Sequence, residues 1–143
     1  MITDEIRQKA ALITFATRAD RKGRAFALKF DRGGLITAVA VDAVSGKIHM
    51  VAYKNEETLR LALALGEAVY WSRSRQEIWH KVATSGYTQK MLEIRTDCDQ
   101  DALVLRAEQR GAGACQPGNR SCFYRSIILN GTEAELRSAN TSA

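Results

Sequence analysis

Two β-rich runs on either side of a short turn constrain the fold of this chain more than any other feature. Residues 35–41 and 47–53 are dominated by β-branched and other apolar side chains, and Ser45 and Gly46 lie between them. Such residues favour strands, and a glycine-containing turn between two strands is typical of a hairpin. The sequence therefore predicts a β-hairpin in the first half of the chain.

Two helices are predicted around this hairpin. Asn55 is a good N-cap for a leucine-rich segment with acidic residues in its first turn, and Gly66 is a good C-cap for it. Residues 4–19 carry apolar side chains at spacings near three and four, and Thr3 precedes them as an N-cap. The basic segment 18–24 has no apolar residue larger than alanine, so we expect a connector there.

The second half of the chain contains further β segments. Residues 68–72 and 77–81 are predicted to form two short strands, and residues 91–106 one last long β segment that runs through a cluster of carboxylates. These elements predict an α+β fold in which an antiparallel sheet carries a helix on one face.

Length and composition fit a single domain. The chain has 143 residues, of which 45% are hydrophobic and 26% charged. We expect residues 1–25 to form the helix and connector, residues 26–125 the core, and residues 126–143 a C-terminal tail. No apolar run approaches the length of a membrane span and the first residues lack the order of a signal peptide, so we expect a cytoplasmic protein with no membrane partner.

The charge of the chain favours an anionic ligand. The formal net charge is +5, which suits either nucleic acid or a phosphorylated metabolite. Lysine and arginine are scattered along the sequence and form no basic stripe. We therefore expect a small phosphorylated ligand and no nucleic acid, with a nucleic-acid-binding module as the remote alternative.

The segment 96–101 carries three carboxylates at alternate positions. In an extended strand Asp97, Asp99 and Asp101 would share one face while Cys98 points the other way. Three carboxylates on one face suit a hard cation such as Mg²⁺, although such a run is also common in solvated turns and edge strands.

Cys98, Cys115 and Cys122 are the only three cysteines. Three thiolates suit Zn²⁺ and leave one position of its tetrahedron for the water that a hydrolytic site needs. The spacing matches no zinc-finger or zinc-ribbon pattern, so the same cysteines could equally be small buried apolar residues.

Two polar loops could hold a substrate. In the first, a ring could stack on Trp71 while Arg73 or Arg75, with Ser74 between them, grips a phosphate, although an exposed basic hairpin tip would have the same composition. The second is a glycine-containing turn whose amides and hydroxyls could bind anionic oxygen, a common kind of loop. Its residues are Lys81, Thr84, Ser85, Gly86 and Gln89.

Taken together and in order, these motifs resemble the phosphoribosyl-AMP cyclohydrolases of histidine biosynthesis. The resemblance covers residues 26–125 and is far more specific than any one motif. It rests on Lys29-Phe-Asp31, Gly34-Leu-Ile36, Ala52-Tyr53 with Asn55-Glu56, Trp71-Ser-Arg-Ser-Arg75, Thr84-Ser-Gly86, Asp97-Cys-Asp-Gln-Asp101 and Ser121-Cys-Phe-Tyr-Arg125.

The resemblance implies an activity, two metals and an assembly. The activity is hydrolysis of the N1–C6 bond of the adenine ring in N1-(5-phosphoribosyl)-AMP. The assembly is an intertwined homodimer in which Cys98 of one copy and Cys115 and Cys122 of the other bind each zinc. The three aspartates of segment 96–101 would hold Mg²⁺, and both loops and Gln116 would contact the phosphorylated purine.

Four residues depart from the family's usual pattern. Gln116 stands at a position where family members usually carry a histidine that looks like a general base. Glutamine cannot serve in this way, because an amide does not take a proton at neutral pH. Lys54, Val82 and Tyr87 stand where methionine, glycine and asparagine are usual. The sequence therefore leaves two functions open: the cyclohydrolase itself, or a zinc hydrolase of the same fold that cleaves a C–N bond in a different nitrogen heterocycle.

Overall fold

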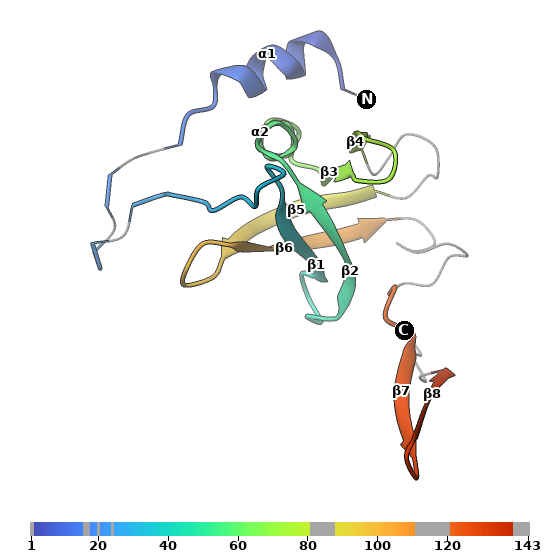
Figure 1. Ribbon diagram of the computed structural model, residues 1–143. Coiled ribbons are helices and arrows are strands. Elements are labelled where there is room, and N and C mark those ends of the chain that lie inside the picture. Colours follow the sequence, from blue (N-terminus) through green and yellow to red (C-terminus); the bar gives the residue numbers. More distant parts are fainter. Residues whose placement is uncertain are drawn as a thin grey trace.

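The fold is seen in a computed structural model of the chain (Figure 1). The structure describes residues 2–15, 18–19, 21–23, 25–80, 88–110 and 121–138, without the side chains of residues 88, 109 and 110. In chain order its elements are α1 (Asp4–Leu12), β1 (Ile36–Asp42), β2 (Ile48–Lys54), α2 (Glu56–Leu65), β3 (Val69–Ser72), β4 (Glu77–His80), β5 (Thr88–Thr96), β6 (Ala102–Arg110), β7 (Arg125–Asn130) and β8 (Glu133–Ser138).

Six strands form one sheet in the order β4-β3-β2-β1-β6-β5. The predicted hairpin is confirmed, because β1 and β2 pair antiparallel and Gly46 in their turn has a φ of 75°. The prediction of a wholly antiparallel sheet is wrong at one place, since β1 pairs with β6 in parallel. Leu103 and Leu105 of β6 lie opposite Ala38 and Ala40 of β1, so this pairing places their apolar side chains in one core.

The single long strand predicted over residues 91–106 is also wrong. β5 and β6 are two antiparallel strands joined by the turn at residues 97–101. The turn closes because the Asp97 side chain accepts hydrogen bonds from the amides of Asp101 and Ala102, at 3.0 and 3.3 Å. Short acidic side chains compete in this way with strand pairing.

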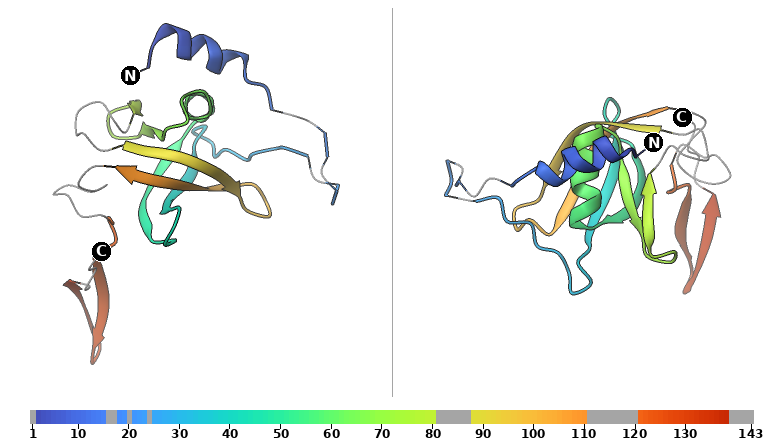
Figure 2. Two further views of the ribbon diagram at one scale, coloured as in Figure 1. Left: turned by 180° about the vertical axis from the view of Figure 1, so that it is seen from behind. Right: turned by 90° about the horizontal axis from the view of Figure 1, so that it is seen from above.

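Within the C-terminal tail predicted for residues 126–143, the described part, up to residue 138, contains two strands. β7 and β8 form an antiparallel hairpin whose turn includes Gly131, with a φ of 65°. Figures 1 and 2 show this hairpin standing away from the six-stranded sheet.

Helix α2 begins and ends where the sequence predicts. The Asn55 side chain accepts from the Thr58 amide while the Thr58 hydroxyl accepts from the Asn55 amide, and Gly66 closes the helix with a φ of 73°. Helix α1 begins after Thr3 as expected but ends at Leu12, well before residue 19. The Arg60 side chain donates to the carbonyl of Ile13 and its guanidinium lies over the Phe15 ring, which draws the chain out of the helix.

The core lies between α2 and one face of the sheet (Figure 2). Ile36, Ala38 and Ala40 of β1 alternate toward this core and pack with Leu59 of α2. The helices of the described ranges are all too short and too polar to cross a membrane.

Within the described residues, no helix covers the opposite face of the sheet. Val39 of β1 is paired with Val51 of β2 on one side and with Val104 of β6 on the other, so the three valines form one row. Val51 and Val104 are 42% and 36% exposed. We call this row the open sheet face.

Candidate active site

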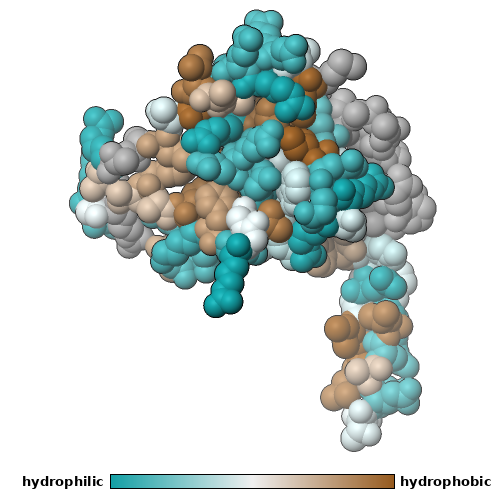
Figure 3. All heavy atoms as spheres, turned by 45° about the horizontal axis from the view of Figure 1, so that its top comes forward, coloured by the Kyte–Doolittle hydropathy of each residue, from teal (hydrophilic) through white to brown (hydrophobic). Residues whose placement is uncertain are grey.

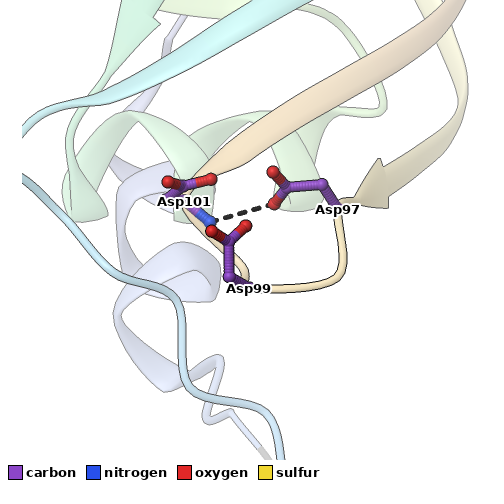
Figure 4. Close-up of side chains that lie close together, drawn as sticks. All are labelled: Asp97, Asp99 and Asp101. Atoms are coloured by element: carbon purple, nitrogen blue, oxygen red, sulfur yellow. Dashed lines mark hydrogen bonds between the residues drawn. The ribbon is translucent and has the colours of Figure 1, made fainter.

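The three predicted metal-binding carboxylates come together in the turn between β5 and β6 (Figure 4). One oxygen from each of Asp97, Asp99 and Asp101 lies within 4.8 Å of the others, and all three residues are exposed. The alternation of an extended strand does not produce this cluster. The turn does, because Asp97 folds it around its own carboxylate.

Gln100 holds the turn against the segment that precedes β1. Its side-chain carbonyl accepts from the Ala27 amide at 2.8 Å, and its amide group donates to the Ala25 carbonyl at 2.9 Å. Its own backbone carbonyl accepts from the Lys29 amide at 2.7 Å. Gln100 has a φ of 59°, and these three hydrogen bonds fix the left-handed conformation that aims the aspartates outward.

The crowded carboxylates affect one another's protonation. A hydrogen bond shared with the Asp97 carboxylate, followed by one with Asp99, raises the pKa of Asp101. Partial desolvation opposes ionisation of Asp97, but hydrogen bonds from Asp101 outweigh it and lower the pKa of Asp97. Within one cluster, the pKa of Asp97 is thus lowered and the pKa of Asp101 is raised.

The two described cysteines lie at different ends of the sheet. Cys98 is exposed in the β5–β6 turn, next to the start of β1, where Ala102 pairs with Thr37. The Cys122 amide donates to the carbonyl of His49 at 2.7 Å, near the far end of β1. Cys115 lies outside the described residues.

The distance between Cys98 and Cys122 can be estimated from their places along and across the strands. With about 3.3 Å per residue along a strand and about 4.8 Å between strands, Cys98 and Cys122 lie roughly 15 Å apart. Two thiolates on one zinc are at most about 4.6 Å apart, because each Zn–S bond is about 2.3 Å. Cys98 and Cys122 of a single chain therefore cannot share a zinc ion in this fold.

The first predicted substrate loop borders an open hollow of about 530 Å³. Trp71 of β3 pairs directly with Tyr53 of β2, and the guanidinium of Arg73 lies 3.8 Å from the centre of the Tyr53 ring. The lining residues are Val51, Ala52, Tyr53, Trp71, Ser72, Arg73, Ser74 and Trp79. Aromatic rings and a guanidinium in one hollow can hold a flat heterocycle and an anionic group together.

Other predicted binding residues lie elsewhere or outside the described ranges. Arg75 is exposed at the β3–β4 turn, 4.0 Å from the Glu77 carboxylate, and does not line the hollow. Gln89 is fully buried, where its side-chain carbonyl accepts from the Tyr70 hydroxyl at 2.6 Å. Lys81, Val82, Thr84, Ser85, Gly86, Tyr87 and Gln116 lie outside the described residues.

Lys54 is buried in the core and not in the hollow. Its side chain has no exposed surface, its Nζ donates to the carbonyl of Val69, and it lies 5.1 Å from the centre of the Tyr70 ring. Burial lowers the pKa of Lys54 to about 7. This departure from the family's usual residue therefore changes the core beneath the site.

Tyr53 and Gln100 are among the residues of the site whose roles were not predicted from the sequence. Tyr53 was assigned to a strand and to one motif of the resemblance but not to substrate binding, although an aromatic residue at the end of β2 opposite Trp71 could have indicated a shared surface. Gln100 carried no signal, because its partners Ala25 and Ala27 are distant in the sequence.

Comparison with known proteins identifies the family of this chain. The family model described as Phosphoribosyl-AMP cyclohydrolase matches residues 50–124. A phosphoribosyl-AMP cyclohydrolase from Bradyrhizobium sp. (strain ORS 278) is 57% identical over 107 residues, covering 75% of this chain and 82% of the relative. One from Brucella abortus (strain S19) is 50% identical over 124 residues, covering 86% of this chain and 89% of the relative. The chain therefore belongs to the phosphoribosyl-AMP cyclohydrolase family.

Proposed function

We propose that this protein hydrolyses the N1–C6 bond of the adenine ring in N1-(5-phosphoribosyl)-AMP, a step of histidine biosynthesis. The relatives' shared name supports the reaction class. The observation that carries the proposal is the hollow in which Trp71 and Tyr53 lie beside the Arg73 guanidinium. It offers a surface for a purine and a donor for a phosphate in one place.

The residues of the hollow bind and orient the substrate. The purine stacks against the aromatic rings, while Arg73, already held flat on Tyr53, keeps donors free for charge-assisted hydrogen bonds to a phosphate. The net charge of +5 attracts a substrate with two phosphate groups.

The thiolates fit a zinc ion only if two copies of the chain contribute. We propose that Cys98 of one copy and Cys115 and Cys122 of its partner hold the zinc, in an intertwined homodimer. The separation of roughly 15 Å between Cys98 and Cys122 supports this arrangement. A bound zinc supplies the chemistry of lowering the pKa of water toward neutrality.

The aspartate cluster fits Mg²⁺. Three carboxylate oxygens within 4.8 Å match the oxygen ligands that this ion prefers, and their exposure leaves room for the water molecules it retains. In this proposal Asp97, Asp99 and Asp101 hold the ion where it can orient a phosphate.

A second function stays open because Gln116 cannot cycle a proton. It is hydrolysis of a C–N bond in a different nitrogen heterocycle by the same zinc-dependent fold. Burial of Lys54 weakens the case for it, since that departure does not alter the lining of the hollow.

The test is to assay the purified, zinc-loaded protein for ring opening of N1-phosphoribosyl-AMP beside a panel of other nitrogen heterocycles. Gln116→His is assayed in parallel, with Gln8→His on the exposed surface of α1 as a control. General-base help is worth about 10²–10⁴ in rate. A gain of this size in Gln116→His alone supports the cyclohydrolase. Turnover of another heterocycle, with a flat response to Gln116→His, supports the second function and overturns the first.

A further inference from the structure

A second hollow lies next to the substrate hollow that Trp71 lines. It measures about 360 Å³ and lies between the segment that precedes β1 and the β5–β6 turn. Lys29, Thr37 and Asp101 are among the residues that line it, and we call it the Lys29 hollow. Its volume is in the range of small-ligand pockets, so it can take a group of the size of a phosphate.

Strand register places the two hollows side by side. Thr37 of β1 lines the Lys29 hollow and is the direct partner of Tyr53 of β2, which lines the substrate hollow. Thr37 is two residues before Val39, so it lies on the same side of the sheet as the open sheet face. Tyr53 pairs in turn with Trp71 of β3. At about 4.8 Å per strand, Trp71 and Thr37 lie roughly 10 Å apart, and one elongated ligand can reach both hollows.

The backbone of Lys29 is held between two turns. Its amide donates to the Gln100 carbonyl at 2.7 Å, in the turn that carries the three aspartates. On its other side, the Asp31 carboxylate closes a turn by accepting from the amides of Gly33 and Leu35, at 2.8 and 2.9 Å. Lys29 is therefore fixed at the border of the hollow, while the Asp31 carboxylate is engaged within its own turn.

The ammonium of Lys29 has no anionic partner within the described residues. Lys29 is exposed, and its side chain makes no ion pair or hydrogen bond with another described side chain. Figure 3 shows hydrophilic and hydrophobic residues interspersed on the face of the molecule that it presents. Because no broad basic surface is seen there, binding of an anion depends on individual groups. A lysine ammonium provides three donors on a flexible stem, which suits a phosphate.

Asp101 belongs both to the Lys29 hollow and to the aspartate cluster. A bare carboxylate repels a phosphate, but a Mg²⁺ ion held by the cluster would make this border of the hollow positive. The hollow therefore suits a phosphate when the cluster holds its ion, and Lys29 supplies the protein's own donor.

We propose that the Lys29 hollow binds one of the two phosphate groups of the substrate through Lys29, while Arg73 binds the other. The inference rests on the proposed function and deepens it, because each phosphate then has a site of its own. The two ribosyl groups leave N1 and N9, at opposite edges of adenine, so the phosphates point apart toward two different hollows. Lys29 is thus a specificity residue, which favours a purine with a phosphoribosyl group at each end over one with a single phosphate.

The kinetic test compares Lys29→Met with Lys9→Met, a matched control on the exposed surface of α1 that lowers the net charge equally. Lys29→Met should raise KM for N1-phosphoribosyl-AMP about 10- to 100-fold with kcat little changed, because a remote phosphate is held alike in the bound substrate and the transition state. A KM in Lys29→Met equal to that of the control overturns the proposal.

A double variant tests whether the two phosphates are held separately. Because Lys29 and Arg73 bind different groups in this proposal, their losses of kcat/KM should multiply when Lys29→Met is combined with Arg73→Ala. A double variant no weaker than Arg73→Ala alone means that both residues serve one phosphate, and it overturns the proposal.

A third measurement needs no turnover. Amide chemical shifts of the isotopically labelled protein are followed as inorganic phosphate is added in the presence of Mg²⁺, and the same spectra show that each variant folds. The amides of Thr37 and Asp101 should shift in the parent, in Lys9→Met and in Arg73→Ala, and should not shift in Lys29→Met. Shifts that persist in Lys29→Met overturn the proposed site.

The ring-opening assay keeps the two proposals distinguishable. A protein that binds phosphate at Lys29 but does not open N1-phosphoribosyl-AMP refutes the proposed function alone. An active protein whose Thr37 and Asp101 amides do not respond to phosphate refutes this inference alone.

Discussion

The Nζ of Lys54 donates a hydrogen bond to the backbone carbonyl of Val69 inside the core. Lys54 has no exposed surface, and the nearby Tyr70 ring lies 5.1 Å from its Nζ. A buried ammonium lacks hydration, which explains why burial lowers the pKa of Lys54 from 10.5 to about 7. The last residue of β2, directly before Asn55 and α2, is thus a lysine whose buried amino group loses its charge near neutral pH.

Lys54→Met should stabilise the protein at neutral and lower pH. Between about pH 7 and 10.5 the unfolded chain holds the Lys54 proton more tightly than the folded chain, so the free energy of unfolding rises with pH in this window. The substitution should remove this rise and add about 3–5 kcal/mol below pH 7. Urea unfolding at several pH values and one protein concentration measures it. Lys90→Met, an exposed change on β5, should keep the parent's pH profile.

Loss of any one thiol should remove zinc and activity together. Cys98→Ser, Cys115→Ser and Cys122→Ser each leave two thiolates, too few for the proposed site. Atomic absorption should find about one zinc per chain in the parent and far less in each variant. A fully active Cys122→Ser protein, or an active parent free of zinc, would contradict the proposed metal site.

Two aspartates of the same turn should respond differently to substitution. Asp97→Ala removes the acceptor of two backbone amides and should cost about 1–2 kcal/mol of stability as well as Mg²⁺ affinity. Asp99→Asn should weaken Mg²⁺ binding with little change in stability. Thermal unfolding and titration calorimetry with Mg²⁺ separate the two effects. Equal losses of stability in both variants would argue against the role of Asp97 in closing the turn.

Arg73 should contribute to substrate binding through the flat guanidinium that it holds on Tyr53. Arg73→Ala should raise KM for N1-phosphoribosyl-AMP about 10- to 100-fold, in line with the loss of a charge-assisted hydrogen bond. Arg73→Lys should recover only part of this loss, because an ammonium is a point charge without the planar fork. Steady-state kinetics of the two variants and the parent decide the matter, and an unchanged KM in Arg73→Ala would count against the proposed binding site.

The elements that could be predicted from the sequence are those whose signals are local. Asn55 and Gly66 mark the ends of α2 because caps act within one turn of a helix. The parallel pairing of Ala38 with Leu103 has no local signal, so the sheet was expected to be antiparallel throughout. The turn at residues 97–101 was mistaken for strand, since alternating aspartates fit both and the hydrogen bonds of Asp97 decide between them.

The same difference between local signals and long-range contacts applies to the residues of the candidate site. Trp71 and Arg73 could be identified from residue types that suit a phosphorylated heterocycle. Tyr53 reaches the hollow only through its register with Trp71, and Gln89 enters the core because its amide pairs with Tyr70. Contacts between strands set both positions, and they depend on the whole sheet.

The central pairing of β1 with β6 also governs when this chain can fold. Thr37 finds its partner only once Ala102 has been synthesised, so at the ribosome β1, β2 and α2 emerge long before the neighbour that completes their sheet. Such high contact order slows folding and leaves a strand edge unpaired in the meantime. The early β1–β2 hairpin and its capped helix therefore form a nascent unit in which the outer edge of β1 stays unpaired until β6 has been synthesised.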